Sequence, residues 1–75
     1  MKTIAITGAS GFIGQHLLKH YLDEGAHVCA IVPDPENLEQ YIHYNNLEIV
    51  KAGFEDFDKI SDLTATRNID IFYYL

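Results

Sequence analysis

Thr7-Gly8-Ala9-Ser10-Gly11-Phe12-Ile13-Gly14 is the stretch of sequence that decides the fold. An apolar run, Ile4-Ala5-Ile6, precedes it, and an amphipathic run from Ile13 to Leu22 follows it. This order predicts a strand, a glycine-rich turn and a helix. The backbone N–H groups of such a turn and the positive end of the helix dipole point at the same place. The stretch therefore predicts an anion-binding site.

Each glycine of the turn has a separate expected role. Gly8 permits the tight turn, Gly11 lets the backbone approach a phosphate, and Gly14 lets the helix press on the strand. In a strand–turn–helix unit of this kind the anion is the pyrophosphate of a dinucleotide. The residues expected to bind it are Gly8, Ser10, Gly11, Phe12, Ile13 and Gly14.

The spacing of the glycines carries a resemblance to a known family. The pattern T-G-x-x-G-x-x-G, which begins at Thr7, is similar to that of the short-chain dehydrogenase/reductase superfamily. Within it the pattern resembles the extended and atypical branches, the NAD-dependent epimerase/dehydratase family and its reductase and non-catalytic relatives. A P-loop is excluded, because no Gly-Lys-Ser/Thr follows the glycines.

The remaining chain alternates apolar strands with helical patterns. We expect strands at 2–7, 27–32, 47–50 and 69–75, and helices at 12–24, from Asp34 onward and from near Asp56. This alternation predicts an α/β fold with a Rossmann-type parallel sheet in the order 3-2-1-4, the first half of a doubly wound domain. Gly25 is expected to end the first helix. The helix residues expected to face the sheet are Ile13, Leu17, Leu18, Tyr21, Leu22, Leu38, Tyr41, Ile42, Phe57, Ile60 and Leu63.

The end of the second expected strand decides between NAD and NADP. An acidic residue there binds the ribose hydroxyls, whereas an arginine accepts the 2′-phosphate. Asp34 lies near the expected place, although it is also a good helix N-cap beside Pro35, and we favour the cap role. Because no Arg or Lys lies between Lys19 and Lys51, the sequence slightly favours NAD.

The loop after the third expected strand departs from the family pattern. Similar enzymes hold Gly-Asp-Leu or Gly-Asp-Phe there, and the resemblance implies that the Asp contacts adenine. In this chain Gly53 stands at the Asp position, so that side-chain contact is missing. Phe54 remains a candidate for contacting the cofactor through its backbone N–H and its ring, with a core position as the alternative.

Composition narrows the class of protein. The net charge of −6 argues against nucleic acid and anionic membrane surfaces as partners. No apolar run approaches the length of a membrane span, and no signal peptide is recognisable. Because Cys29 is the single cysteine, an internal disulfide is excluded. We expect Cys29 to be a small buried hydrophobic residue, which fits a reducing cytoplasm.

Histidines offer only a weak metal pattern. His16 and His20 are four residues apart with Asp23 nearby, a spacing that can bind zinc. All three lie on the polar side of the expected helix, so we favour solvated side chains and predict no metal site. His27 and His43 are expected to be isolated.

Catalytic residues are not recognisable in this chain. The resemblance implies a Tyr acid/base with a Lys four residues later, and none of the five tyrosines has that Lys. We therefore expect residues 1–75 to be the N-terminal, dinucleotide-binding part of an oxidoreductase, without a substrate domain. The resemblance alone implies that the substrate of such an enzyme is a nucleotide sugar. The alternatives are a dinucleotide-sensing regulator and a vestigial fragment. Because the last expected strand would be an apolar sheet edge, we also expect self-association into a homo-oligomer.

Overall fold

Four parallel strands form the central sheet of the part described by a computed structural model, residues 2–53 and 55–75. They are β1 (Thr3–Thr7), β2 (His27–Val32), β3 (Leu47–Lys51) and β4 (Ile71–Tyr73). Their order is β3-β2-β1-β4, and every pairing is parallel. The fold class and strand order predicted from the sequence are therefore confirmed.

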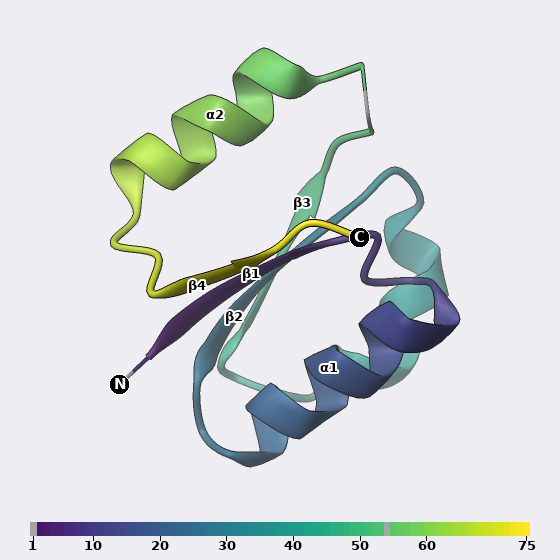
Figure 1. The fold of residues 1–75 in the computed structure, drawn as a ribbon. Coiled ribbons are helices and arrows are strands. Elements are labelled where there is room, and N and C mark those ends of the chain that lie inside the picture. Colours follow the sequence, from purple (N-terminus) through teal and green to yellow (C-terminus); the bar gives the residue numbers. More distant parts are fainter. Residues whose placement is uncertain (1, 54) are drawn as a thin grey trace.

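Helices cover both faces of this sheet (Figure 1). The α-helix α1 (Phe12–Asp23) and the 3-10 helix η1 (Pro35–Tyr41) lie on one face, and α2 (Phe57–Thr66) lies on the other. Since both faces are covered, the inner strands must be apolar on both sides, which explains the nearly continuous apolar run of β2. No helix of the described residues is long and apolar enough to span a bilayer.

Two apolar layers hold the fold together, one on each face of the sheet. Alternate residues of β1 divide between them, because successive side chains of a strand point to opposite faces. Ile4 and Ile6 pack in the layer under α1 and η1, whereas Ala5 packs in the layer under α2. The helical residues buried in the two layers are Leu18, Leu22, Leu38, Tyr41 and Leu63.

The C-terminus of α1 is closed as predicted at Gly25. This glycine has a φ of +86°, the left-handed conformation that favours glycine. The N–H of Ala26 donates to the carbonyl of Tyr21, and the N–H of Gly25 donates to that of Leu22. These two bonds form a Schellman motif, which turns the chain directly into β2.

The second expected helix is a 3-10 helix rather than an α-helix. Its turns close by bonds between residues three apart, such as Asn37 N–H to Asp34 carbonyl (3.2 Å). With three residues per turn, Leu38 and Tyr41 lie on the same side and are both buried. Ile42 leaves that side and is 68% exposed, so its predicted inward position is wrong.

Two further expectations need correction. Ile13 is 64% exposed, because the buried line of α1 runs through Gly14, Leu18 and Leu22 instead. The last strand is shorter than the predicted 69–75, since regular pairing with β1 covers only Ile71–Tyr73.

Candidate dinucleotide-binding site

The turn between β1 and α1 has a shape that only glycine permits at two of its positions. Gly8 has a φ of +65°, and its N–H donates to the carbonyl of Ile31 on β2. Gly14 lies against the turn so closely that a Cβ would stand 2.2 Å from the Gly8 oxygen and 2.8 Å from the Ala9 Cα. Gly8 and Gly14 are therefore required by the fold itself, as the sequence predicted.

Gly11 is different, because nothing within the described part of the chain requires a glycine there. Its φ is −74°, which any residue adopts, and a Cβ would meet only the Gly8 oxygen at 3.4 Å, an ordinary contact. Gly11 is the N-cap of α1 but provides no side-chain cap bond. The space left by its missing side chain therefore opens on the outside of the turn.

The first turn of α1 presents hydrogen-bond donors to that space. The first amides of a helix, here those of Phe12, Ile13 and Gly14, have no acceptor within the helix. Gly11 N–H donates instead to the Gly8 carbonyl at 3.0 Å, which fixes the turn. A cradle without a side chain, in front of the positive end of a helix, fits an anionic diphosphate.

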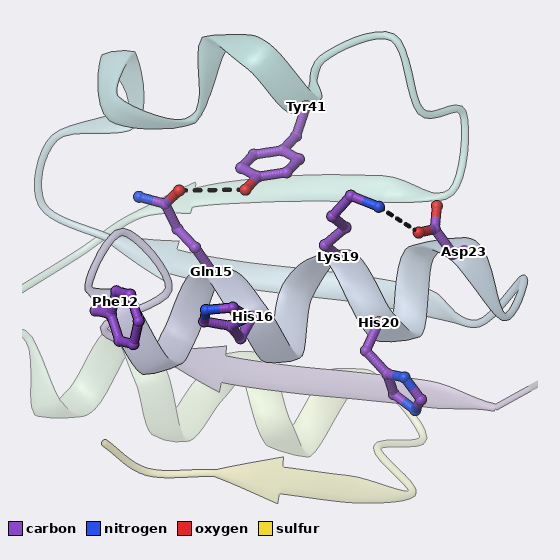
Figure 2. A pocket seen from close by; sticks show the side chains of 7 residues that line it. All are labelled: Phe12, Gln15, His16, Lys19, His20, Asp23 and Tyr41. Atoms are coloured by element: carbon purple, nitrogen blue, oxygen red, sulfur yellow. Dashed lines mark hydrogen bonds and ion pairs between the residues drawn. The ribbon is translucent and has the colours of Figure 1, made fainter.

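Gln15 fixes the turn from the side of the helix. Its Nε2 donates to the Ser10 carbonyl at 2.8 Å, and its Oε1 accepts from Tyr41 Oη at 3.2 Å and from Gln40 Nε2 at 3.1 Å. Figure 2 shows Gln15 and Tyr41 meeting between α1 and η1. The sequence analysis missed this network, because Gln15 and Tyr41 are separated by 26 residues.

Thr7, the residue before the first glycine, joins β1 to the chain after β4. It is buried, its Oγ1 donates to the Tyr73 carbonyl at 3.4 Å, and it accepts from Leu75 N–H at 3.0 Å. The hydroxyl thus replaces regular strand pairing where β4 ends. This explains why a Thr suits the first position of the glycine pattern.

A small hollow lies at the carboxyl ends of the strands, beside the turn. It has a volume of about 70 Å³ and is lined by Thr7, Gly8, Ile31, Pro33, Ala52, Gly53, Ile60 and Tyr74. Ligands of open α/β sheets bind at this edge, where the strand order reverses. The hollow adjoins the turn, so one elongated ligand can contact both.

A larger hollow, about 460 Å³, lies on the outer surface of α1 (Figure 2). Its lining comes from the helix and from Tyr41, not from the strand ends. Within it Lys19 Nζ and Asp23 Oδ2 form an exposed pair at 2.8 Å. Lys19 and Tyr44 both bond Asp23 and lower the pKa of its carboxyl. The position and chemistry of this hollow do not match the cradle at the turn.

Asp34 follows β2 and provides no side-chain cap bond to η1. Asp34 holds the N-cap position of η1, as favoured from the sequence, but its carboxylate is exposed and makes no bond to the helix. Two lysine side chains also lie closer to the end of β2 than the sequence indicated. Lys51 pairs in register with Val32 at the tip of β2, and Lys51 and Lys59 line a hollow of about 280 Å³ beside Pro33. The same hollow includes the carboxylates Glu55 and Asp56.

Phe54, a candidate from the sequence, lies outside the described residues, as does the side chain of Phe57. The preceding residue, Gly53, lines the small hollow and donates its N–H to Asp56 Oδ2 at 2.9 Å. This bond holds the loop after β3 in place at the start of α2.

Two of the histidines, His16 and His20, are placed as expected, whereas His27 is not. His16 and His20 are exposed, and Asp23 bonds Lys19 and Tyr44 rather than either of them. His27, expected to be isolated, lies with its Nε2 3.5 Å from Glu48 Oε1. Cys29 is buried as predicted, and burial together with its bond to Glu48 raises its pKa to about 11.

Comparison with known proteins identifies the family. Residues 8–73 match the family model described as NAD(P)H-binding. The chain is 44% identical over 51 residues to dihydroflavonol 4-reductase of Arabidopsis thaliana, covering 68% of this chain and 13% of that protein. It is 30% identical over 87 residues to an uncharacterized protein of Methanocaldococcus jannaschii, covering 99% of this chain and 26% of that protein.

Solved structures show the same fold. The UDP-Glc/GlcNAc 4-epimerase of Campylobacter jejuni matches with a TM-score of 0.85 at 19% identity, over 100% of this chain and 24% of that one. The dTDP-glucose 4,6-dehydratase of Bacillus anthracis, in complex with NAD, matches with 0.83 at 17% identity, over 100% and 26%. The chain thus spans about a quarter or less of the length of these relatives. Its glycine turn, its strand order and the match over residues 8–73 together show that the chain belongs to the NAD(P)H-binding family.

Proposed function

We propose that residues 1–75 act as one dinucleotide-binding unit that holds NAD at the carboxyl edge of the sheet. The pyrophosphate would lie in the cradle at Gly11, against the amides of Phe12, Ile13 and Gly14. Gly8 and Ser10 complete the turn, and Asp34 would accept hydrogen bonds from the adenosine ribose. Phe54 stays a candidate neighbour of the adenine.

The observation that supports this proposal most is the contrast between Gly11 and the other two glycines of the turn. Gly8 and Gly14 are explained by a positive φ and a backbone contact, whereas Gly11 has no such reason within the described chain. A glycine that the fold does not need, in front of helix amides without intrahelical acceptors, is explained by the close approach of a ligand.

The bound dinucleotide would supply a hydride donor or acceptor to an oxidoreductase or epimerase. The identity of 44% to a dihydroflavonol 4-reductase, over the part of the chain that it covers, supports the interpretation that the reaction is a reduction. A nucleotide sugar as substrate remains an expectation from the resemblance. The preference for NAD rests on Asp34 and on the carboxylates Glu55 and Asp56, which lie in the same hollow as Lys51 and Lys59.

The test is a titration of the chain with NADH, followed by the nicotinamide fluorescence. Gly11→Asp places a side chain and a negative charge in the cradle, and Asp is at the same time a good helix N-cap. We expect this variant to fold and to bind NADH at least about tenfold more weakly, a loss of about 1.4 kcal/mol.

The matched control is Asn45→Asp, which adds the same charge at an exposed position before β3, at the opposite edge of the sheet. We expect its affinity for NADH to equal that of the unmodified chain. Equal affinity of Gly11→Asp and the unmodified chain would show that the cradle does not hold the pyrophosphate.

A further inference from the structure

Three potential metal ligands meet near the amino ends of the strands, at the opposite end of the sheet from the proposed dinucleotide site. His27 begins β2, and Cys29 follows two residues later on the same face of that strand. Glu48 of β3 is the register partner of Cys29, so its side chain lies on that face too. The parallel pairing thus brings together an imidazole, a thiol and a carboxylate.

The distances between these groups are short. Glu48 Oε1 lies 3.4 Å from Cys29 Sγ and 3.5 Å from His27 Nε2. All three potential ligand atoms lie within 4.8 Å of one another. His27 is the most exposed of the three, with 38% of its side chain accessible, which opens the cluster to solvent.

These separations match the edges of a tetrahedral zinc site. With usual bond lengths of about 2.0–2.3 Å, the edges between ligand atoms are about 3.3–3.8 Å. Two of the three edges already have this length in the absence of an ion. The third, between His27 and Cys29, is no longer than 4.8 Å.

Arg67, at the end of α2, orients the carboxylate of this cluster. Its Nε donates to Glu48 Oε1 at 3.0 Å, and its guanidinium also pairs with Oε2. These contacts hold Oε1 on the side of Cys29 and His27. Hydrogen bonds of this kind to a ligating carboxylate are common around protein metal sites.

We propose that His27, Cys29 and Glu48 bind one divalent transition-metal ion of zinc-like preference, with solvent as the fourth ligand. The imidazole and thiolate select such an ion over Mg²⁺ or Ca²⁺, which prefer all-oxygen sites. On binding, the Cys29 S–H bond breaks, a metal–sulfur bond forms, and the proton leaves to solvent. No electron transfer is involved.

The metal would join β2 to β3 next to α2, far from the cofactor. β2 has six residues, so its two ends are separated by about 16 Å. The metal proposal therefore does not depend on the proposed dinucleotide binding. Metal binding is expected to stabilise the sheet near the amino ends of β2 and β3.

Cobalt(II) is the probe, because a Co²⁺–thiolate bond gives a charge-transfer absorption in the near ultraviolet. We expect the reduced, metal-free chain to bind one equivalent of Co²⁺ with this absorption, and Zn²⁺ to displace it. Cys29→Ala should abolish the absorption. His27→Gln and Glu48→Gln should each weaken binding at least about tenfold.

The matched control removes the other histidine pair, His16→Gln with His20→Gln on the exposed side of α1. We expect this double variant to bind Co²⁺ like the unmodified chain. His27→Gln keeps the test decisive if Cys29→Ala does not fold, because His27 is only half-buried. Absence of the thiolate absorption, unchanged affinity in His27→Gln, or loss of binding in the control would each overturn the proposal.

Discussion

Gly14→Ala tests how closely α1 lies against the glycine turn. The added Cβ would stand 2.2 Å from the Gly8 oxygen, whereas ordinary contacts begin near 3.4 Å, so the helix and the turn must separate by about 1 Å. The atoms that it meets belong to the backbone and cannot rotate away. Overpacking of this kind costs about 1–3 kcal/mol, and the rigid neighbours place Gly14→Ala at the upper end.

An opposing effect must be subtracted from that cost. Alanine in a helix is more favourable than glycine by about 1 kcal/mol, so the expected net loss of unfolding free energy is about 2 kcal/mol. A chain of this length has a total stability of about 4–11 kcal/mol. With a urea m-value near 1 kcal/mol/M, the unfolding midpoint should fall by about 2 M. Circular dichroism during urea titration measures this shift.

Gly11→Ser is the matched comparison, because it adds a side chain three residues earlier without a backbone clash. Serine at an N-cap bonds an amide of the first turn, so the unfolding free energy should stay within about 0.5 kcal/mol of the unmodified chain or rise. The same bond would occupy a donor meant for phosphate and weaken NADH binding about 10- to 100-fold. A Gly14→Ala chain as stable as the unmodified one would refute the close contact of α1 with the turn.

Three further predictions concern the cofactor, the acid stability and the free sheet edge. NAD should bind at least about tenfold more tightly than NADP in competition. The double variant Lys51→Gln with Lys59→Gln should leave this ratio of affinities unchanged. A preference for NADP that the double variant removes would reverse the choice of cofactor. Because Arg67 lowers the pKa of Glu48 below its ordinary value near 4.5, the resulting stability is present above that value and is lost as the pH falls through the lowered pKa. Glu48→Gln should therefore flatten the dependence of the melting temperature on pH in this acid range, and an unchanged profile would contradict the role of the pair. The sheet order places β4 (Ile71–Tyr73) at an edge, so the chain should sediment as an oligomer at tens of micromolar; a monomer with a sharp melting transition would contradict this.

The parts of the fold that the sequence predicts well are those governed by a repeating local pattern. Gly8 and Gly14 could be placed because a strand–turn–helix unit imposes its own geometry. Strands β1 and β2 could be placed because both of their faces are buried, which leaves long apolar runs. The 3-10 helix was missed because Asp34-Pro35-Glu36 is an equally good start for either kind of helix.

The parts that the sequence could not predict depend on the register between strands. The sequence shows no Arg or Lys between Lys19 and Lys51, yet the pairing of β2 with β3 places Lys51 beside the end of β2. The sequence predicts an isolated His27, although Glu48 of the neighbouring strand lies beside it. A search for ligands along one helix finds His16 and His20, whereas a search across paired strands finds His27, Cys29 and Glu48.

The two ends of the parallel strands, the carboxyl edge and the amino edge of the sheet, differ in how far their chemistry follows from local sequence. At the carboxyl edge, the cradle consists of backbone amides of one continuous turn, so its glycine pattern identifies it without knowledge of the neighbouring strands. At the amino edge, every ligand of the proposed metal site is a side chain, and Glu48 reaches Cys29 only because their strands pair in one register. A shift of one residue in that register would turn Glu48 to the opposite face. The amino edge is therefore the more sensitive indicator of correct strand pairing, and Co²⁺ binding there would test the β2–β3 register independently of the cofactor.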